Sequence, residues 1–197
     1  MRKQELLFVL VFGSAWGLFE ATLGAGLHLA RVPLAGTVMA SIGFSVLLAA
    51  LRRGLSPLSL ASVSVVAASW KLLDTVVFGV PPLDPMVIRP AIAIASQGLA
   101  FTLFFGWNRG WNRSVFLAPR LFVTVAAGMA LVRVVSFVVL GQPRLRLPVP
   151  LASILLELAI TTVGALALFA VIALVSPIHP IVSSSTSEEM IPNKKAN

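Results

Sequence analysis

Seven polar side chains interrupt long apolar stretches of this sequence, at positions where a lipid bilayer would surround them. They are Glu20, Lys71, Asp74, Arg89, Gln97, Arg133 and Glu157. Ionisable groups at membrane depth are costly, and they usually mark a ligand or ion pathway. Carboxyl, ammonium, guanidinium and amide groups together can bind the polar ends of a small molecule, while the indoles of Trp16 and Trp70 offer apolar faces. These residue types therefore predict a site for a small ligand.

The spacing of these residues predicts that they share one level of the membrane. Glu20, Lys71, Asp74 and Arg133 lie about 14 to 17 residues from the inner ends of stretches that run outward. Gln97 and Glu157 lie roughly 8 to 11 residues from the outer ends of stretches that run inward, with Arg89 at the outer mouth. We therefore expect a water-accessible cavity in the outer half of the membrane.

The alternative is that these groups pair with one another and only fix the packing of the helices. Lys71 and Asp74 are one helical turn apart, and Arg133 could reach Glu157 across two helices. Both hypotheses can hold together, since ion pairs often line a pocket before a ligand enters. Lys71 and Asp74 are the residues most expected to satisfy each other, and the weakest candidates for ligand contact.

Six apolar stretches carry these side chains, and each approaches the length of about 20 residues that crosses a bilayer core. They cover roughly residues 5–27, 34–51, 57–78, 86–106, 119–140 and 150–175. The 197-residue chain is 58% hydrophobic with a mean hydropathy of +0.97, which leaves too little polar surface for a water-soluble domain. We predict an all-α polytopic membrane bundle of six transmembrane helices over residues 1–180, followed by a disordered cytoplasmic tail over residues 181–197.

The distribution of basic residues predicts the orientation of the bundle. The start of the chain resembles a signal peptide, but the first apolar stretch continues past signal length, so we expect a retained helix. The net charge of +8 comes mostly from short loops, which indicates topology rather than nucleic-acid binding. With a cytoplasmic N-terminus, nine basic residues lie on the cytoplasmic side and four on the outer side. The cytoplasmic residues are Arg2, Lys3, Arg52, Arg53, Arg109, Arg113, Arg120, Lys194 and Lys195. The outer residues are Arg31, Arg89, Arg144 and Arg146. This count predicts a multi-pass protein of the cell inner (cytoplasmic) membrane with both termini cytoplasmic.

The sequence shows no pattern of a catalytic or metal site. It has no cysteine and two histidines. His28, at the outer end of the first stretch, is more typical of a solvated helix end than of a metal ligand, and His179 follows the last stretch. No nucleophile–base motif and no phosphate-binding glycine loop is present. We therefore expect no enzyme activity, no cofactor and no metal, and any use of ATP would require a partner.

The sequence around the first predicted loop resembles a known family. Residues 17–28 read GLFEATLGAGLH, and residues 32–40 read VPLAGTVMA. A Gly/His segment before a Pro-x-x-Gly start of the second helix is similar to this region in substrate-binding S components of energy-coupling factor (ECF) transporters. The resemblance covers residues 5–176 by architecture and about residues 17–40 by motif.

The resemblance implies a subunit that captures a vitamin or similar micronutrient and works with a separate membrane coupling protein and ATPase subunits. It places the substrate at Arg89, Gln97, Arg133 and Glu157, under caps formed by residues 28–33, beginning with His28, and residues 80–85. The coupling protein would contact a small-residue face that includes Ala15, Ala21 and Ala25. With the residues of the polar layer, the candidate substrate-binding set is Trp16, Glu20, His28, Trp70, Lys71, Arg89, Gln97, Arg133 and Glu157. Lys71 and Asp74 depart from the better-known members and leave the substrate class open.

Three other functions are alternatives. A non-transport scaffold or complex subunit predicts a polar layer that is fully paired and dry. A membrane enzyme acting on a lipid would use Glu20 or Glu157 as acid or base, but the sequence lacks the acidic pairs that hold a metal and a diphosphate. A channel or secondary carrier would need broken helices in matched halves, which the sequence does not indicate.

Overall fold

The computed structural model describes residues 3–32, 34–106, 117–140 and 151–175, and all regular secondary structure in these ranges is helical. The predicted all-α class is therefore confirmed. The elements in chain order are α1 (Lys3–Phe19), the π-helix η1 (Glu20–Gly24), α2 (Ala25–Leu29), α3 (Ala35–Arg52), α4 (Pro57–Trp70), α5 (Leu73–Phe78), α6 (Pro85–Phe101), the π-helix η2 (Thr102–Gly106), α7 (Leu117–Leu140) and α8 (Leu151–Val175). The predicted tail over residues 181–197 lies outside the described residues.

Within the described ranges, five helical segments are long and apolar enough to cross a membrane. They are Lys3–Leu27, Ala35–Arg52, Pro57–Phe78, Pro85–Phe105 and Ala152–Val175. The remaining predicted span coincides with α7, which contains a shorter apolar helical stretch, Ala118–Val132. Five of the six predicted spans are thus seen as helices of membrane-crossing character, while the full count of six stays a prediction.

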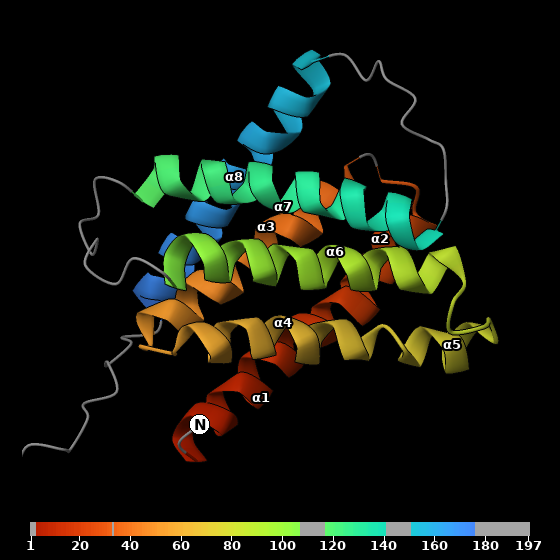
Figure 1. Ribbon diagram of the computed structural model, residues 1–197, viewed down its shortest axis with the longest axis horizontal. Helices are drawn as coiled ribbons and strands as arrows, with labels where there is room; N and C mark the ends of the chain where they lie inside the picture. The colour runs from red at the N-terminus through yellow and green to blue at the C-terminus, as the bar shows by residue number, and fades with distance from the viewer. Residues whose placement is uncertain (1–2, 33, 107–116, 141–150, 176–197) are drawn as a thin grey trace, which may run out of the picture.

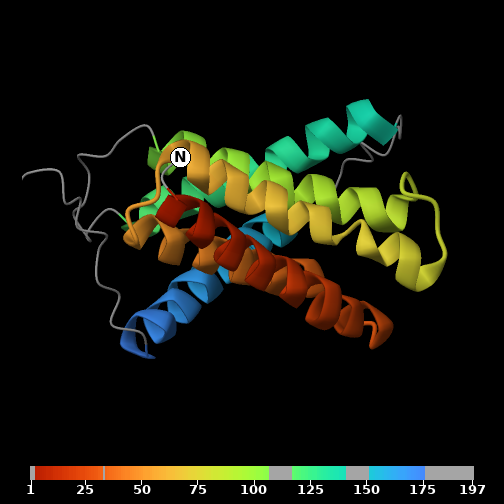
Figure 2. The same ribbon diagram turned by 90° about the horizontal axis from the view of Figure 1, so that it is seen from below.

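The long helices form a bundle around α3. Contacts join α1 to α4, α4 to α6, α6 to α7, α7 to α8 and α8 to α3, and α3 also touches α1, α4 and α6. Most residues in the second half of α3 are accordingly buried, including Phe44, Leu47 and Ala50. Successive long helices run in alternate directions, so the start of α1 and the end of α8 lie at the same end of the bundle (Figures 1 and 2).

Glycines let the helix backbones approach closely, as expected where helices pack without a hydrophobic driving force. A Cβ on Gly13 would lie 2.7 Å from Val66 Cβ, and one on Gly17 would lie 2.4 Å from the ring of Trp70. The Gly13-x-x-x-Gly17 motif therefore packs α1 against α4 of the same chain. Gly98 of α6 meets Ser64 of α4 in the same way.

Two serines of α3 connect it to α8 by hydrogen bonds within the apolar bundle. The Ser41 hydroxyl is 3.0 Å from the Thr37 carbonyl and 3.3 Å from the Thr161 carbonyl. The Ser45 hydroxyl is 2.7 Å from the Ser41 carbonyl and 3.0 Å from the Ala165 carbonyl. A hydroxyl has one proton, so each serine shares it between its own helix and the neighbour. These contacts fix the rotation of α8 about its axis relative to α3.

The contact between Gly98 and Ser64 generates a stability prediction. A Cβ on Gly98 would lie 1.9 Å from Ser64 Oγ and 2.1 Å from Ser64 Cβ, so Gly98→Ala overpacks the α4–α6 contact. We expect a loss of about 1–3 kcal/mol in unfolding free energy, measured as a lower melting temperature in detergent. The matched control is Gly36→Ala, since a Cβ there meets nothing within 4 Å. Adding Ser64→Gly should recover much of the loss, and equal melting temperatures for the Gly98 and Gly36 variants would contradict the packing.

Candidate functional site

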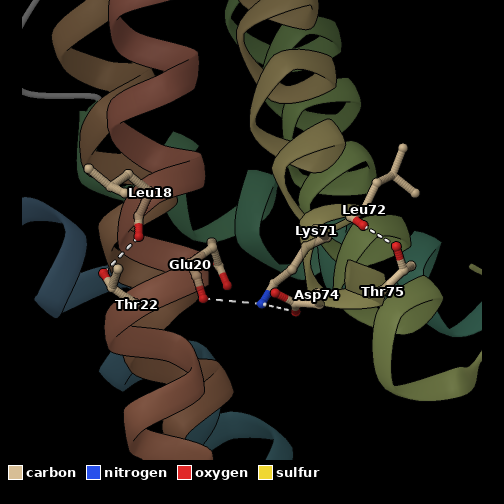
Figure 3. Close-up of polar contacts among 7 residues, drawn as sticks. All are labelled: Leu18, Glu20, Thr22, Lys71, Leu72, Asp74 and Thr75. Atoms are coloured by element: carbon tan, nitrogen blue, oxygen red, sulfur yellow. Dashed lines mark hydrogen bonds and ion pairs between the residues drawn. The ribbon is translucent and has the colours of Figure 1, made fainter. Parts of the chain in front are cut away.

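Three ionisable side chains are buried in the part of the chain that the structure describes. They are Glu20, Lys71 and Asp74, with exposed fractions of 7%, 4% and 6%. Each comes from a point at which its helix departs from regular α geometry. Figure 3 shows the Lys71 ammonium group between Glu20 of η1 and Asp74 of α5.

The first irregularity is the π-helix that begins at Glu20. Hydrogen bonds of a π-helix run to the fifth residue rather than the fourth, which widens the turn and disturbs the regular pairing of carbonyl groups. Lys71 Nζ donates to the backbone carbonyl of Glu20 at 3.1 Å. Two residues earlier in the sequence, the Leu18 carbonyl accepts from the Thr22 hydroxyl at 2.7 Å (Figure 3). Side chains thus satisfy the backbone where regular helix pairing is perturbed.

The second irregularity is a turn between α4 and α5, within the predicted third span. α4 ends at Trp70 and α5 begins at Leu73, and the Asp74 N–H bonds the Lys71 carbonyl at 3.1 Å, three residues back. The Leu72 carbonyl accepts from the Thr75 hydroxyl at 2.6 Å (Figure 3). Hydropathy alone predicted a continuous helix here. The turn places both Lys71 and Asp74 on the side of the segment that faces η1.

Lys71 and Asp74 form an ion pair, as their spacing predicted. Lys71 Nζ lies 3.2 Å from Asp74 Oδ2. The Glu20 carboxyl group lies within electrostatic reach of Lys71, Trp16 and Asp74. A Cβ on Gly24 would lie 3.3 Å from Glu20 Oε2, so the absence of a side chain at Gly24 gives this carboxyl group room. The cluster therefore contains one ammonium and two carboxyl groups.

A second group of polar atoms meets at Gly43 of α3. A Cβ on Gly43 would lie 2.4 Å from Trp16 Cζ2 and 2.9 Å from Gln97 Oε1, so α1, α3 and α6 converge there. Trp16 is fully buried, and within the described residues its indole N–H has no hydrogen-bond acceptor. The indole lies near the Glu20 carboxyl group without reaching hydrogen-bond geometry. The buried Gln97 Oε1 likewise has no donor among the described residues. Buried polar groups are nearly always paired, so two such atoms at one place require an explanation.

The structure brings together part of the predicted site. Trp16, Glu20 and Lys71 form one cluster, and Gln97 joins it through the contact at Gly43. The remaining predicted residues differ in position. Trp70 is half-buried against Gly17 and serves helix packing, Arg89 is exposed near the start of α6, and Glu157 is half-buried on α8, which packs against α3 and α7.

Two predicted site residues cannot be placed by their side chains. His28 belongs to α2 and Arg133 to α7, but both side chains lie outside the described residues. The predicted pair between Arg133 and Glu157 stays a prediction for the same reason. No group of three or more His, Cys, Asp or Glu side chains that could hold a metal ion occurs in the described segments.

Sequence reasoning missed Gly43 and the two helix irregularities. Gly24 and Gly26, which follow Glu20 closely, are the available signal for a disturbed helix, since glycine weakens helix interiors. Nothing in the residues around Lys71 marks the turn. Gly43 is one of several glycines in apolar stretches, and its role depends on which side chains of α1 and α6 face it.

Comparisons with family models, curated proteins and solved structures found no match to this chain. The resemblance to S components therefore rests on residues 17–40 and on the helical architecture alone.

The Lys71–Asp74 pair generates a prediction about stability. Lys71→Met removes the only buried ammonium of the cluster and leaves Asp74 and the Glu20 carbonyl without it. Breaking a buried pair costs about 3–5 kcal/mol, so we expect a clear drop in melting temperature in detergent. Lys71→Met combined with Asp74→Asn should be more stable than Lys71→Met alone, because the Asp74 carboxylate is then no longer left buried without its cation.

The matched control is Lys3→Met, which removes an exposed lysine at the start of α1. Equal stability of the Lys71 and Lys3 variants would contradict a structural role for the pair.

Proposed function

We propose that this protein is a membrane-embedded subunit that captures a small micronutrient and works with a separate coupling protein and ATPase subunits. The observation that carries the proposal is the polar cluster of Trp16, Glu20, Lys71, Asp74 and Gln97, in which Trp16 Nε1 and Gln97 Oε1 are buried and have no hydrogen-bond partner among the described residues. In a bundle of helices that face lipid, such a cluster is costly unless it serves a function.

The backbone irregularities support a binding role for this cluster. Non-helical backbone at membrane depth is tolerated where it is buried in protein or lines a cavity, because lipid offers no hydrogen-bond partners. Transport proteins use interrupted helices to bring backbone and side-chain polar groups to a ligand near the bilayer middle. Here η1 and the turn between α4 and α5 face each other, and the Lys71 side chain of the turn bonds the Glu20 carbonyl of η1. Two irregular segments at one place support a site rather than a local packing defect.

The scaffold alternative is supported by the Lys71–Asp74 pair and opposed by Trp16 and Gln97. A purely structural polar layer is expected to be fully paired. Lys71 and Asp74 meet that expectation, whereas Trp16 Nε1 and Gln97 Oε1 do not among the described residues. A bound molecule with an N–H group would supply the missing donor for Gln97 Oε1, so we favour substrate capture.

The proposal includes a topology with six spans in the inner membrane and both termini cytoplasmic. At the end of the bundle where α1 begins, the guanidinium carbon of Arg53, directly after α3, lies 5.5 Å from the ring centroid of Phe8. At the same end, the Arg120 side chain of α7 donates to the Phe104 carbonyl of η2. Long basic side chains near helix ends typically reach the membrane interface. The presence of these two arginines supports a cytoplasmic location for this end of the bundle.

The topology is tested by labelling intact cells. A reporter fused at the C-terminus should behave as cytoplasmic, and a tag inserted between Pro82 and Pro85 should be reachable from outside. A tag after Arg53 serves as the control and should be reached only after permeabilisation. Labelling of that tag in intact cells would reverse the orientation and place the polar cluster nearer the cytoplasm.

Substrate capture is tested by native mass spectrometry of the protein released from detergent. We expect a constant added mass from a retained small molecule, with no ATP hydrolysis and no uphill uptake by the isolated chain in vesicles. Glu20→Gln should reduce the retained fraction, because losing a charge-assisted hydrogen bond costs about 1.5–3 kcal/mol, or roughly 10- to 150-fold in affinity. Gln4→Leu, on the exposed start of α1, is the control.

Absence of any retained mass in both wild type and control would favour the scaffold. Ion-driven accumulation by the chain alone would indicate a secondary carrier.

A further inference from the structure

The cluster around Glu20 holds more negative than positive groups. Among the described residues it has two carboxyl groups, Glu20 and Asp74, and one ammonium, Lys71. Lys71 Nζ bonds Asp74 Oδ2 at 3.2 Å and the main-chain carbonyl of Glu20 at 3.1 Å. The ammonium is thus hydrogen-bonded to the Asp74 side chain and to the Glu20 backbone, but not to the Glu20 carboxyl group. With both carboxyl groups ionised, the cluster has a net charge of −1.

The atoms beside Glu20 add a second acceptor and an aromatic face. Trp16 lies one turn before Glu20 and is fully buried, with its indole N–H unpartnered among the described residues. Gln97 Oε1 approaches the Trp16 ring from α6, because a Cβ on Gly43 would lie 2.9 Å from this oxygen and 2.4 Å from Trp16 Cζ2. A carboxylate and an amide oxygen accept hydrogen bonds from N–H groups. An indole ring is the aromatic face that attracts a cation best.

We propose that this cluster binds a protonated nitrogen that carries N–H donors, such as a primary ammonium or an amidinium group. Glu20 supplies the counter-charge, Gln97 a second acceptor and Trp16 an aromatic face. The inference rests on the proposed function and names the substrate class: a small molecule with such a group at one end.

The tight surroundings restrict the size of this group. A Cβ on Gly24 would lie 3.3 Å from Glu20 Oε2, and a Cβ on Gly43 would lie 2.4 Å from Trp16 Cζ2. The surroundings of both side chains are therefore closely packed. A primary ammonium or flat amidinium presents donors in little space, whereas a trimethylammonium group is bulkier and has no N–H. The site should therefore bind a primary ammonium or amidinium group more tightly than a trimethylammonium group of equal charge.

The test uses the fluorescence of Trp16 in the full chain with Trp70, Trp107 and Trp111 replaced by Phe. Benzamidine, protonated at neutral pH, should change the Trp16 emission saturably. Benzyltrimethylammonium and benzoate, which keep the ring but lack N–H donors or the positive charge, should bind at least 10-fold more weakly. Glu20→Gln should weaken benzamidinium binding by about 10- to 150-fold, which is the effect of losing a charge-assisted hydrogen bond. Glu5→Gln, the same substitution near the start of α1, the helix that leads into η1, is the control and should bind like the parent.

Each outcome supports or overturns the proposal. Equal binding of benzamidinium and benzyltrimethylammonium, binding of benzoate, or equal affinity of the Glu20 and Glu5 variants would overturn it. If Glu20→Gln does not fold, Gln97→Met replaces it, with a weaker but measurable loss expected. A co-purifying molecule that benzamidinium does not displace leaves substrate capture standing and overturns the cation site, whereas absence of both kinds of binding overturns both.

Discussion

The structure depends on one ammonium group that serves two irregular helices at once. Lys71 Nζ neutralises Asp74 within its own segment and caps the Glu20 carbonyl of η1 across the bundle. In lipid no water can perform either task, and an unsatisfied carbonyl or carboxylate there costs several kcal/mol. The turn between α4 and α5 and the π-helix η1 therefore stabilise each other through this side chain. Removing the cation leaves both without compensation.

A basic side chain also bonds a backbone carbonyl of the second π-helix, η2. Arg120 of α7 donates through Nε to the Phe104 carbonyl at 2.8 Å, and its guanidinium carbon lies 4.7 Å from the ring centroid of Phe105. In both cases a basic side chain from another helix bonds a carbonyl of a π-segment. A π-turn perturbs regular carbonyl pairing, and a long cationic side chain is a donor that can reach it from a neighbouring helix. The position of each basic residue is thus explained by backbone geometry as well as by charge.

The candidate site and the packing of the bundle use the same helices, and Trp16 belongs to both. Gly13 and Gly17 bring α1 against α4, and Trp70 fills the space over Gly17. That close approach is what places Glu20 within reach of Lys71. On the other side of α1, Gly43 admits the indole of Trp16 and the amide of Gln97. Small residues therefore set the distance between helices, and the polar groups between them follow from it.

The sequence by itself determined the class of protein, the approximate extent of the long helices and the Lys71–Asp74 pair. Apolar length and i, i+3 spacing are properties of single segments, so they hold whatever the segment packs against. The grouping of Trp16 and Gln97 at Gly43, the packing role of Trp70 and the interruption at Lys71 were decided by the tertiary structure. Counting residues along a helix gives the depth of a side chain but not the direction in which it points. In a membrane bundle, lipid-facing and core-facing surfaces are both apolar, so periodicity does not reveal that direction. Only the contacts between helices fix the rotation of each helix about its axis, and with it the set of polar groups that meet.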